Sequence, residues 1–122
     1  MTIDFATTKF LEQMAAGGGK PLHEMTPDEA RALGAKLAEL AGPAPEMVRV
    51  DEQRIARPDG VVPVRVLVPI EPVRGVLVYY HGGGWVLGTI DESDTMARKL
   101  AERTSCAVVL VEYRLAPEHR YP

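Results

Sequence analysis

The stretch VLVYYHGGGWVLG, residues 76–88, decides the fold of this chain. Its first five residues are apolar or aromatic without interruption, which predicts a strand covered on both faces. A histidine and three consecutive glycines follow directly. Because glycines add no side-chain packing and cost conformational entropy, three together indicate a backbone that something approaches closely. The stretch therefore predicts a strand with a binding loop at its carboxyl end.

The residues after this loop predict a crossover to a parallel strand. Residues 91–104 place acids in a first helical turn and apolar residues on one face. Residues 107–113, AVVLVEY, read as the next strand, which Pro117 prevents from extending. Strand, helix and strand in this order make a right-handed parallel crossover. If nothing followed it, strand 107–113 would leave an open edge and an uncovered face.

The residues before the loop predict a β-hairpin. From residue 48 the apolar period is two, with a turn at 58–60. Val62, Val64, Val66 and Val68 would share the one covered face. Pro63 lacks an N–H, so this part of the strand is expected near an edge or a bulge. The sheet is therefore expected to be mixed, antiparallel first and then parallel.

Two helices are expected before the hairpin. Residues 3–15 have apolar residues near helical spacing, and Gly17–Gly19 end that helix. The second helix has Thr26 as N-cap and Glu29 completing a capping box, and Gly42-Pro43 end it. Its apolar stripe consists of Ala30, Leu33, Leu37, Leu40 and Ala41. The chain thus divides into N-terminal helices, 1–45, and a sheet with its crossover helix, 46–122, an α/β arrangement of about four strands.

Composition narrows the possible partners. The chain has 122 residues, 46% of them hydrophobic, with 14 basic and 17 acidic residues and a net charge of −3. This charge is well mixed, so no nucleic-acid partner is expected. No apolar run is long enough for a membrane span, and the N-terminus lacks the apolar core of a signal peptide. The single Cys106 fits a reducing compartment, so a cytoplasmic location is expected.

Two chemistries place a glycine-rich loop after such a strand. In dinucleotide binding, Gly82, Gly84 and Gly88 would approach the pyrophosphate and Glu112 would bind ribose. Leu87, however, stands where that motif needs its last glycine, and three acids at the helix start, Asp91, Glu92 and Asp94, would repel the phosphates. In acyl transfer, backbone N–H groups stabilise an oxyanion, and glycines leave room for the carbonyl. The remaining interpretation of these glycines is a turn that binds no ligand.

The acyl-transfer reading coincides with a family resemblance. YYHGGGWVLG, followed about thirty residues later by VEYRLAPEHRYP, closely resembles the hormone-sensitive lipase family of α/β-hydrolases. The resemblance covers the whole chain, with residues 1–45 similar to that family's cap segment and the strands similar to the first part of its core. It implies a carboxylic ester hydrolase that acts on small ester substrates, with short to medium acyl groups, and needs no cofactor or metal.

The resemblance also implies roles for residues of the loop 81–84 and its neighbours. The N–H groups of Gly83 and Gly84 would form the oxyanion hole. Gly82 would set the loop, His81 would hold it, and Trp85 would border the acyl or alcohol pocket. In the YRLAPEHRYP segment, Arg114 and Glu118 would pair and brace the loop.

The nucleophile that this family carries in a G-x-S-x-G elbow is not found in the sequence. Ser93 and Ser105 have no flanking glycines and read as polar residues at helix ends, and His119 precedes the position of the catalytic base. The triad is therefore expected on a complementary C-terminal segment or chain. The alternative is a non-catalytic truncated paralogue that binds an acyl compound or a protein partner. Homo-oligomerisation stays open.

Overall fold

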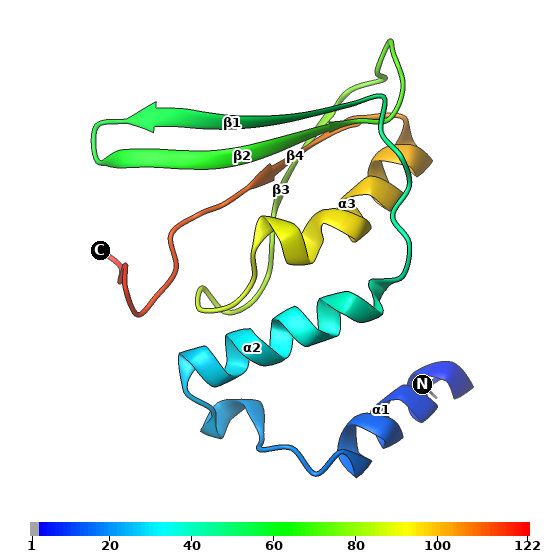
Figure 1. The fold of residues 1–122 in the computed structure, drawn as a ribbon, viewed down its shortest axis with the longest axis vertical. Coiled ribbons are helices and arrows are strands. Elements are labelled where there is room, and N and C mark those ends of the chain that lie inside the picture. Colours follow the sequence, from blue (N-terminus) through cyan, green and yellow to red (C-terminus); the bar gives the residue numbers. More distant parts are fainter. Residues whose placement is uncertain (1–2) are drawn as a thin grey trace.

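The computed structural model describes residues 3–122 (Figure 1). Within these residues, three α-helices and a four-stranded sheet follow one another. They are α1 (Phe5–Ala16), α2 (Pro27–Ala38), β1 (Arg49–Arg57), β2 (Gly60–Val68), β3 (Val76–Tyr80), α3 (Ile90–Thr104) and β4 (Ala107–Val111). Short 3₁₀ turns, Leu22–Glu24 and Glu39–Ala41, flank α2. The predicted order of helices, hairpin and crossover is confirmed.

The sheet has the strand order β1-β2-β4-β3. β1 pairs with β2 and β2 with β4 in antiparallel fashion, whereas β3 and β4 are parallel. The mixed sheet and the parallel crossover are therefore as predicted. The expectation that strand 107–113 would form an open edge is wrong, because β4 lies between β2 and β3. Strand order depends on contacts between distant segments, which periodicity along the chain does not encode.

The open edge belongs to β3 instead. Val76 and Val78 are 63% and 56% exposed, and Tyr80 is exposed as well. The predicted coverage of this strand on both faces is therefore wrong for the described residues 3–122. Its apolar side chains face outward because α3 covers only one face of the sheet and β3 has a neighbour on only one side.

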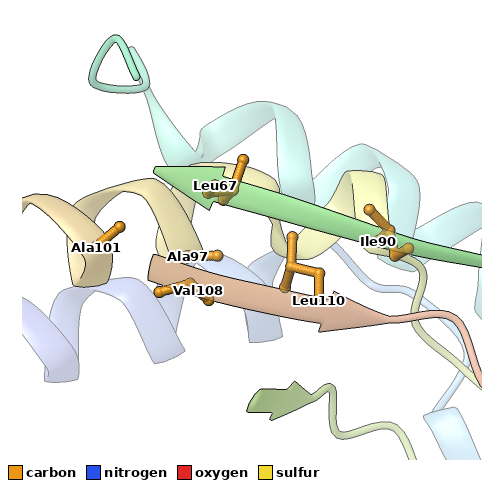
Figure 2. Packing of buried hydrophobic residues seen from close by; sticks show 6 residues of the cluster. All are labelled: Leu67, Ile90, Ala97, Ala101, Val108 and Leu110. Carbon is orange, nitrogen blue, oxygen red and sulfur yellow. The ribbon is translucent and has the colours of Figure 1, made fainter. Parts of the chain in front are cut away.

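The core lies between the sheet and α3 (Figure 2). Leu67, Val108 and Leu110 are at most 1% exposed and point toward the helix. The helix contributes Ile90, Ala97 and Ala101 to the same cluster. Because successive strand residues point to opposite faces, α3 covers the Leu67 face of β2. Val64 and Val68 on the opposite face are buried too, so the predicted coverage of the Val62–Val68 face is confirmed at these two residues. The prediction that only one face of the strand is covered is wrong.

Pro63 lies within β2 opposite Arg54 of β1. Its carbonyl oxygen accepts a hydrogen bond from the N–H of Glu112, at 3.0 Å. The nitrogen and oxygen of one residue point to the same edge of a strand, so the missing N–H of Pro63 faces away from β1. It falls just beyond the last β2–β4 pair, Val64 with Val111. Pro63 therefore does not lie at an edge of the sheet. It lies where the hydrogen-bonded ladder of β2 and β4 ends, within a central strand.

The helix α2 begins as predicted. The Thr26 hydroxyl accepts the N–H of Glu29, and the Glu29 carboxylate accepts the N–H of Thr26. Only Ala30 of the predicted stripe is buried, and Leu40 lies on an exposed 3₁₀ turn. α1 has no buried residue. Among residues 3–122, no helix has the length and apolar character that crossing a membrane requires.

Candidate active site

The loop from His81 to Gly88 joins the carboxyl end of β3 to α3. Its centre is a tight turn in which the N–H groups of Val86 and Leu87 both donate to the carbonyl oxygen of Gly83, at 3.1 and 2.9 Å. Gly83, Gly84 and Gly88 have φ angles of +125°, +60° and +99°. Backbone of this kind is open to glycine and strained for other residues.

Two of these glycines are also required by space. A Cβ at Gly83 would lie 2.1 Å from the carbonyl oxygen of Leu87, and one at Gly88 would lie 2.2 Å from Nδ1 of His81. A Cβ at Gly82 or Gly84 would meet nothing within 4 Å. The space above Gly82 and Gly84 is therefore open for an approaching group, whereas Gly83 and Gly88 shape the loop itself.

The turn leaves backbone donors available. Among residues 3–122, the N–H groups of Gly83 and Gly84 donate to no other group of the chain. Two free donors on consecutive glycines of fixed conformation can bind one oxygen atom that carries developing negative charge. The geometry is therefore suited to an anionic or strongly polarised oxygen.

His81 is 6% exposed and lies under the loop. Its Nδ1 is 2.8 Å from the carbonyl oxygen of Gly82, so this nitrogen carries the proton and donates. The Tyr113 hydroxyl donates to the carbonyl oxygen of His81 at 2.5 Å, and the two rings stack with centroids 4.3 Å apart. Burial raises the pKa of Tyr113, with the charge of Glu112 adding to the effect, which keeps this donor protonated.

Trp85 follows the glycines in a left-handed conformation, with φ of 60°. This conformation costs a non-glycine residue on the order of 1–2 kcal/mol, and such strain persists where the surroundings enforce it. Here the Trp85 carbonyl accepts the N–H of Ala116 at 2.8 Å. The indole is 76% exposed and borders an open hollow of about 870 Å³ together with residues of the 114–122 segment.

A second hollow, of about 310 Å³, lies between the loop and the start of α2. Gly83 and Gly84 line it from the loop. The other lining residues are mostly apolar and come from both sides: Leu22, Met25, Thr26, Pro27, Ala30, Val86 and Leu87. The two glycines with free donors thus border a small apolar space that the N-terminal segment helps to form.

The segment after β4 braces the loop through partners that the sequence did not indicate. The predicted pair of Arg114 and Glu118 is wrong. Glu118 binds both terminal nitrogens of Arg31, each at 2.8 Å, and Arg114 binds Asp59 in the hairpin turn at 2.6 Å. Both partners are more than 50 residues away in sequence, so local spacing favoured the wrong pairing.

The start of α3 is already occupied by carboxylates. Glu112 Oε2 accepts the N–H of Ile90 at 2.8 Å, and the Thr89 hydroxyl accepts the N–H of Glu92. Asp91 and Asp94 both bind Arg65. A pyrophosphate would have to displace these acids, which weighs against the dinucleotide reading. Among the described residues, no three His, Cys, Asp or Glu side chains are grouped to hold a metal ion.

Both serines lie at ends of α3, as predicted. Ser93 is in its first turn and Ser105 is its C-cap, with φ of 56°. The sequence did not predict the roles of three residues that shape the loop: Arg31, Gly88 and Tyr113. Gly88 was considered only for phosphate spacing, although its place directly before the Thr89 N-cap could have indicated a sharp turn. No local signal distinguishes Arg31 or Tyr113.

Known proteins resemble this chain in sequence and in fold. A family model described as alpha/beta hydrolase fold matches residues 77–122. An ester hydrolase from the metagenome of Lake Arreo is similar to 99% of this chain, with a TM-score of 0.88 and 33% identity. The described chain therefore has part of the α/β-hydrolase fold. A hyperthermophilic esterase from Pyrobaculum calidifontis is similar to the whole of this chain, with a TM-score of 0.86 and 33% identity.

Two curated proteins that are similar to this chain are named as ester hydrolases. Carboxylesterase NlhH of Mycobacterium tuberculosis is 45% identical over 72% of the chain, and the ethyl acetate hydrolase of Pseudomonas putida is 36% identical over 88%. The chain spans 29% and 36% of the length of these two relatives, and 41% and 40% of the two solved structures. It corresponds to their N-terminal portion.

Proposed function

We propose that this chain is the part of a carboxylic ester hydrolase of the hormone-sensitive lipase type that carries the cap segment and the oxyanion hole. The observation that carries the proposal is the pair of free N–H donors on Gly83 and Gly84, beside an apolar hollow. Esters present the groups that such a site suits, a carbonyl oxygen that becomes anionic and apolar groups on either side of it. The similarity to carboxylesterases supports the same reaction.

In this reaction a serine attacks the ester carbonyl, and the carbonyl oxygen takes on negative charge that Gly83 and Gly84 stabilise. Collapse of this intermediate releases the alcohol, and water then hydrolyses the acyl-enzyme. His81 supports the loop through its hydrogen bond to the carbonyl of Gly82, and Trp85 borders the neighbouring open hollow. We place the Ser-Asp-His triad on a further polypeptide segment. The open edge of β3 and its exposed Val76 and Val78 support this, because they leave a surface for such a segment to cover.

The substrates that fit the hollow are small esters with short apolar groups. About 310 Å³ is at the lower end of ligand sites, which favours short acyl or alcohol groups over long chains. We further propose a cytoplasmic location for the whole protein, supported by the single Cys106, which leaves no pair for a disulfide within these residues.

The proposal predicts hydrolysis and covalent trapping by the full-length protein, expressed from the complete reading frame that encodes residues 1–122. We expect release of nitrophenol from p-nitrophenyl butyrate, and stoichiometric inactivation by a p-nitrophenyl alkylphosphonate. Mass spectrometry should locate the phosphonate on a serine other than Ser93 and Ser105. A folded protein that neither hydrolyses the ester nor reacts with the phosphonate would contradict the proposal and favour a non-catalytic binding protein.

A further inference from the structure

Arg31 makes contacts that its place on an N-terminal helix does not suggest. Its side chain is 29% exposed, and all of its nitrogens donate hydrogen bonds. Nε donates to the carbonyl oxygen of Val86 at 2.9 Å, and Nη2 donates to the carbonyl oxygen of Ala116 at 2.9 Å. Nη1 and Nη2 also bind the two carboxylate oxygens of Glu118. One guanidinium thus joins α2, the glycine loop and the segment after β4.

These bonds converge on the turn that displays the free donors. Val86 accepts from Arg31 through its carbonyl and donates its N–H to Gly83. Ala116 accepts from Arg31 and donates its N–H to the carbonyl of Trp85. The turn is therefore held on two sides, once directly through Val86 and once through Ala116. No other side chain among residues 3–122 bonds to both segments.

We propose that Arg31 is a positioning residue for ester hydrolysis, which holds the turn of the glycine loop so that Gly83 and Gly84 present their N–H groups to the oxyanion. The inference rests on the proposed function. Arg31 does not line the hollow beside the two glycines, so it acts through the backbone of Val86 and Ala116. It also links the N-terminal segment to the loop, because its own helix lines that hollow through Pro27 and Ala30.

An arginine suits this task and a lysine does not. The guanidinium presents donors in a rigid plane, so it can bind a carboxylate with two parallel bonds and still direct Nε to a third acceptor. A lysine ammonium is a single point on a flexible chain and cannot reach Val86, Ala116 and Glu118 in the same geometry. Substitution by lysine should therefore keep the charge and lose most of the positioning.

The ion pair of Arg31 and Glu118 persists over the pH range of an esterase assay. The hydrogen bonds from Arg31 lower the pKa of Glu118 to about 2, and the ordinary value of such a carboxyl is 4.5. Since the pKa is lowered in the folded state, the contribution to stability is complete above pH 4.5 and is lost as pH falls through about 2. Asp28, on the same helix as Arg31, lies 4.0 Å from Nη1 and is a second carboxylate near the guanidinium.

The test compares Arg31→Gln, Arg31→Lys and Glu118→Gln in the full-length protein. Lys36→Gln is the matched control, because it removes a positive charge from an exposed position of the same helix. We expect Arg31→Gln to lower kcat for p-nitrophenyl butyrate about tenfold, the size of one lost charge-assisted bond, with KM within about twofold. Arg31→Lys should fall almost as far, Glu118→Gln less, and Lys36→Gln should match the wild type.

Amide hydrogen exchange supplies a readout that does not depend on activity. In Arg31→Gln, exchange of the Val86 and Leu87 amides should accelerate about tenfold, while the amides of β4 keep their wild-type rates. Equal acceleration in β4 would mean that Arg31 only stabilises the fold, and unchanged rates at Val86 and Leu87 with unchanged kcat would also overturn the proposal. If Arg31→Gln fails to fold, Glu118→Gln decides, because Glu118 is half exposed.

The two readouts separate this proposal from the proposed function. If the wild-type protein has no esterase activity, the hydrogen bonds from Arg31 cannot serve ester hydrolysis. Exchange at Val86 and Leu87 would still show whether Arg31 fixes the turn, and rates unchanged by the substitution would overturn that as well.

Discussion

Replacing Gly83 with alanine is expected to abolish the turn of the glycine loop. The new Cβ would lie 2.1 Å from the carbonyl oxygen of Leu87 and 2.6 Å from its carbonyl carbon, which are both backbone atoms. Relief requires Leu87 to move, which breaks the two hydrogen bonds that Gly83 accepts from Val86 and Leu87. Loss of one oxyanion donor costs about a hundredfold or more in rate, so kcat/KM for p-nitrophenyl butyrate should fall at least that far.

The substitution should also lower the free energy of unfolding, by on the order of 2–3 kcal/mol in a denaturant titration, because it combines backbone strain with a steric clash. Gly60→Ala is the matched control. Gly60 has a φ of +139°, near that of Gly83, but a Cβ there meets nothing within 4 Å. If both variants lose the same stability and activity, the contact with Leu87 is not what requires glycine at position 83.

Replacing Gly88 with alanine is expected to displace His81. The Cβ would lie 2.2 Å from His81 Nδ1 and 2.8 Å from the carbonyl oxygen of Gly82, so it would occupy the hydrogen bond between them. His81 is buried and stacked on Tyr113, which leaves its ring little room to turn away. We expect a loss of about 2–4 kcal/mol in the free energy of unfolding, since an overpacked core site and a broken buried hydrogen bond act together.

The Gly88→Ala variant should lose esterase activity, because His81 then no longer holds the carbonyl of Gly82 at the start of the loop. The ring proton on Nδ1 gives a direct readout, since its NMR signal should disappear from the slowly exchanging set. Gly42→Ala is the control, with a φ of +72° and no atom within 4 Å of the added Cβ. Wild-type stability and an unchanged Nδ1 proton in Gly88→Ala would contradict the account of this contact.

Features set by neighbouring residues could be predicted from the sequence. The capping box of Thr26 and Glu29 is a pattern over four residues, and the hairpin turn at 58–60 is equally local. The crossover helix shows its own amphipathic period and acidic first turn. The glycine run after β3 indicated a binding loop for the same reason, because the need for small residues is visible in the residue types at those positions.

Features set by distant contacts could not be predicted. The alternation in β2 shows a period of two, but it does not say that α3 lies on the Leu67 face. Strand order placed β3 at the edge, where its apolar side chains are exposed in residues 3–122. Likewise, Glu118 has Arg114 close by in sequence and binds Arg31. In each case the spatial neighbour is chosen by packing between segments.

The candidate site shows the same division. Its glycines were found, but Gly82, which was expected to set the loop, has neither a positive φ nor a crowded Cβ. Gly88 has both and was not considered as part of the loop. The difference arises because the need for glycine depends on where the loop returns, here onto His81, and the sequence shows only that glycines are present.

The most direct test of the central claim compares Gly84→Ala with Gly18→Ala in the full-length protein. Both glycines have a φ of +60° and open space around the added Cβ, so the two changes strain the backbone equally. Only the methyl group at position 84 would stand where the ester carbonyl must approach. We predict that Gly84→Ala lowers kcat/KM for p-nitrophenyl butyrate at least about tenfold, while Gly18→Ala retains wild-type activity. Equal activity in both variants would contradict an oxyanion hole at Gly83 and Gly84.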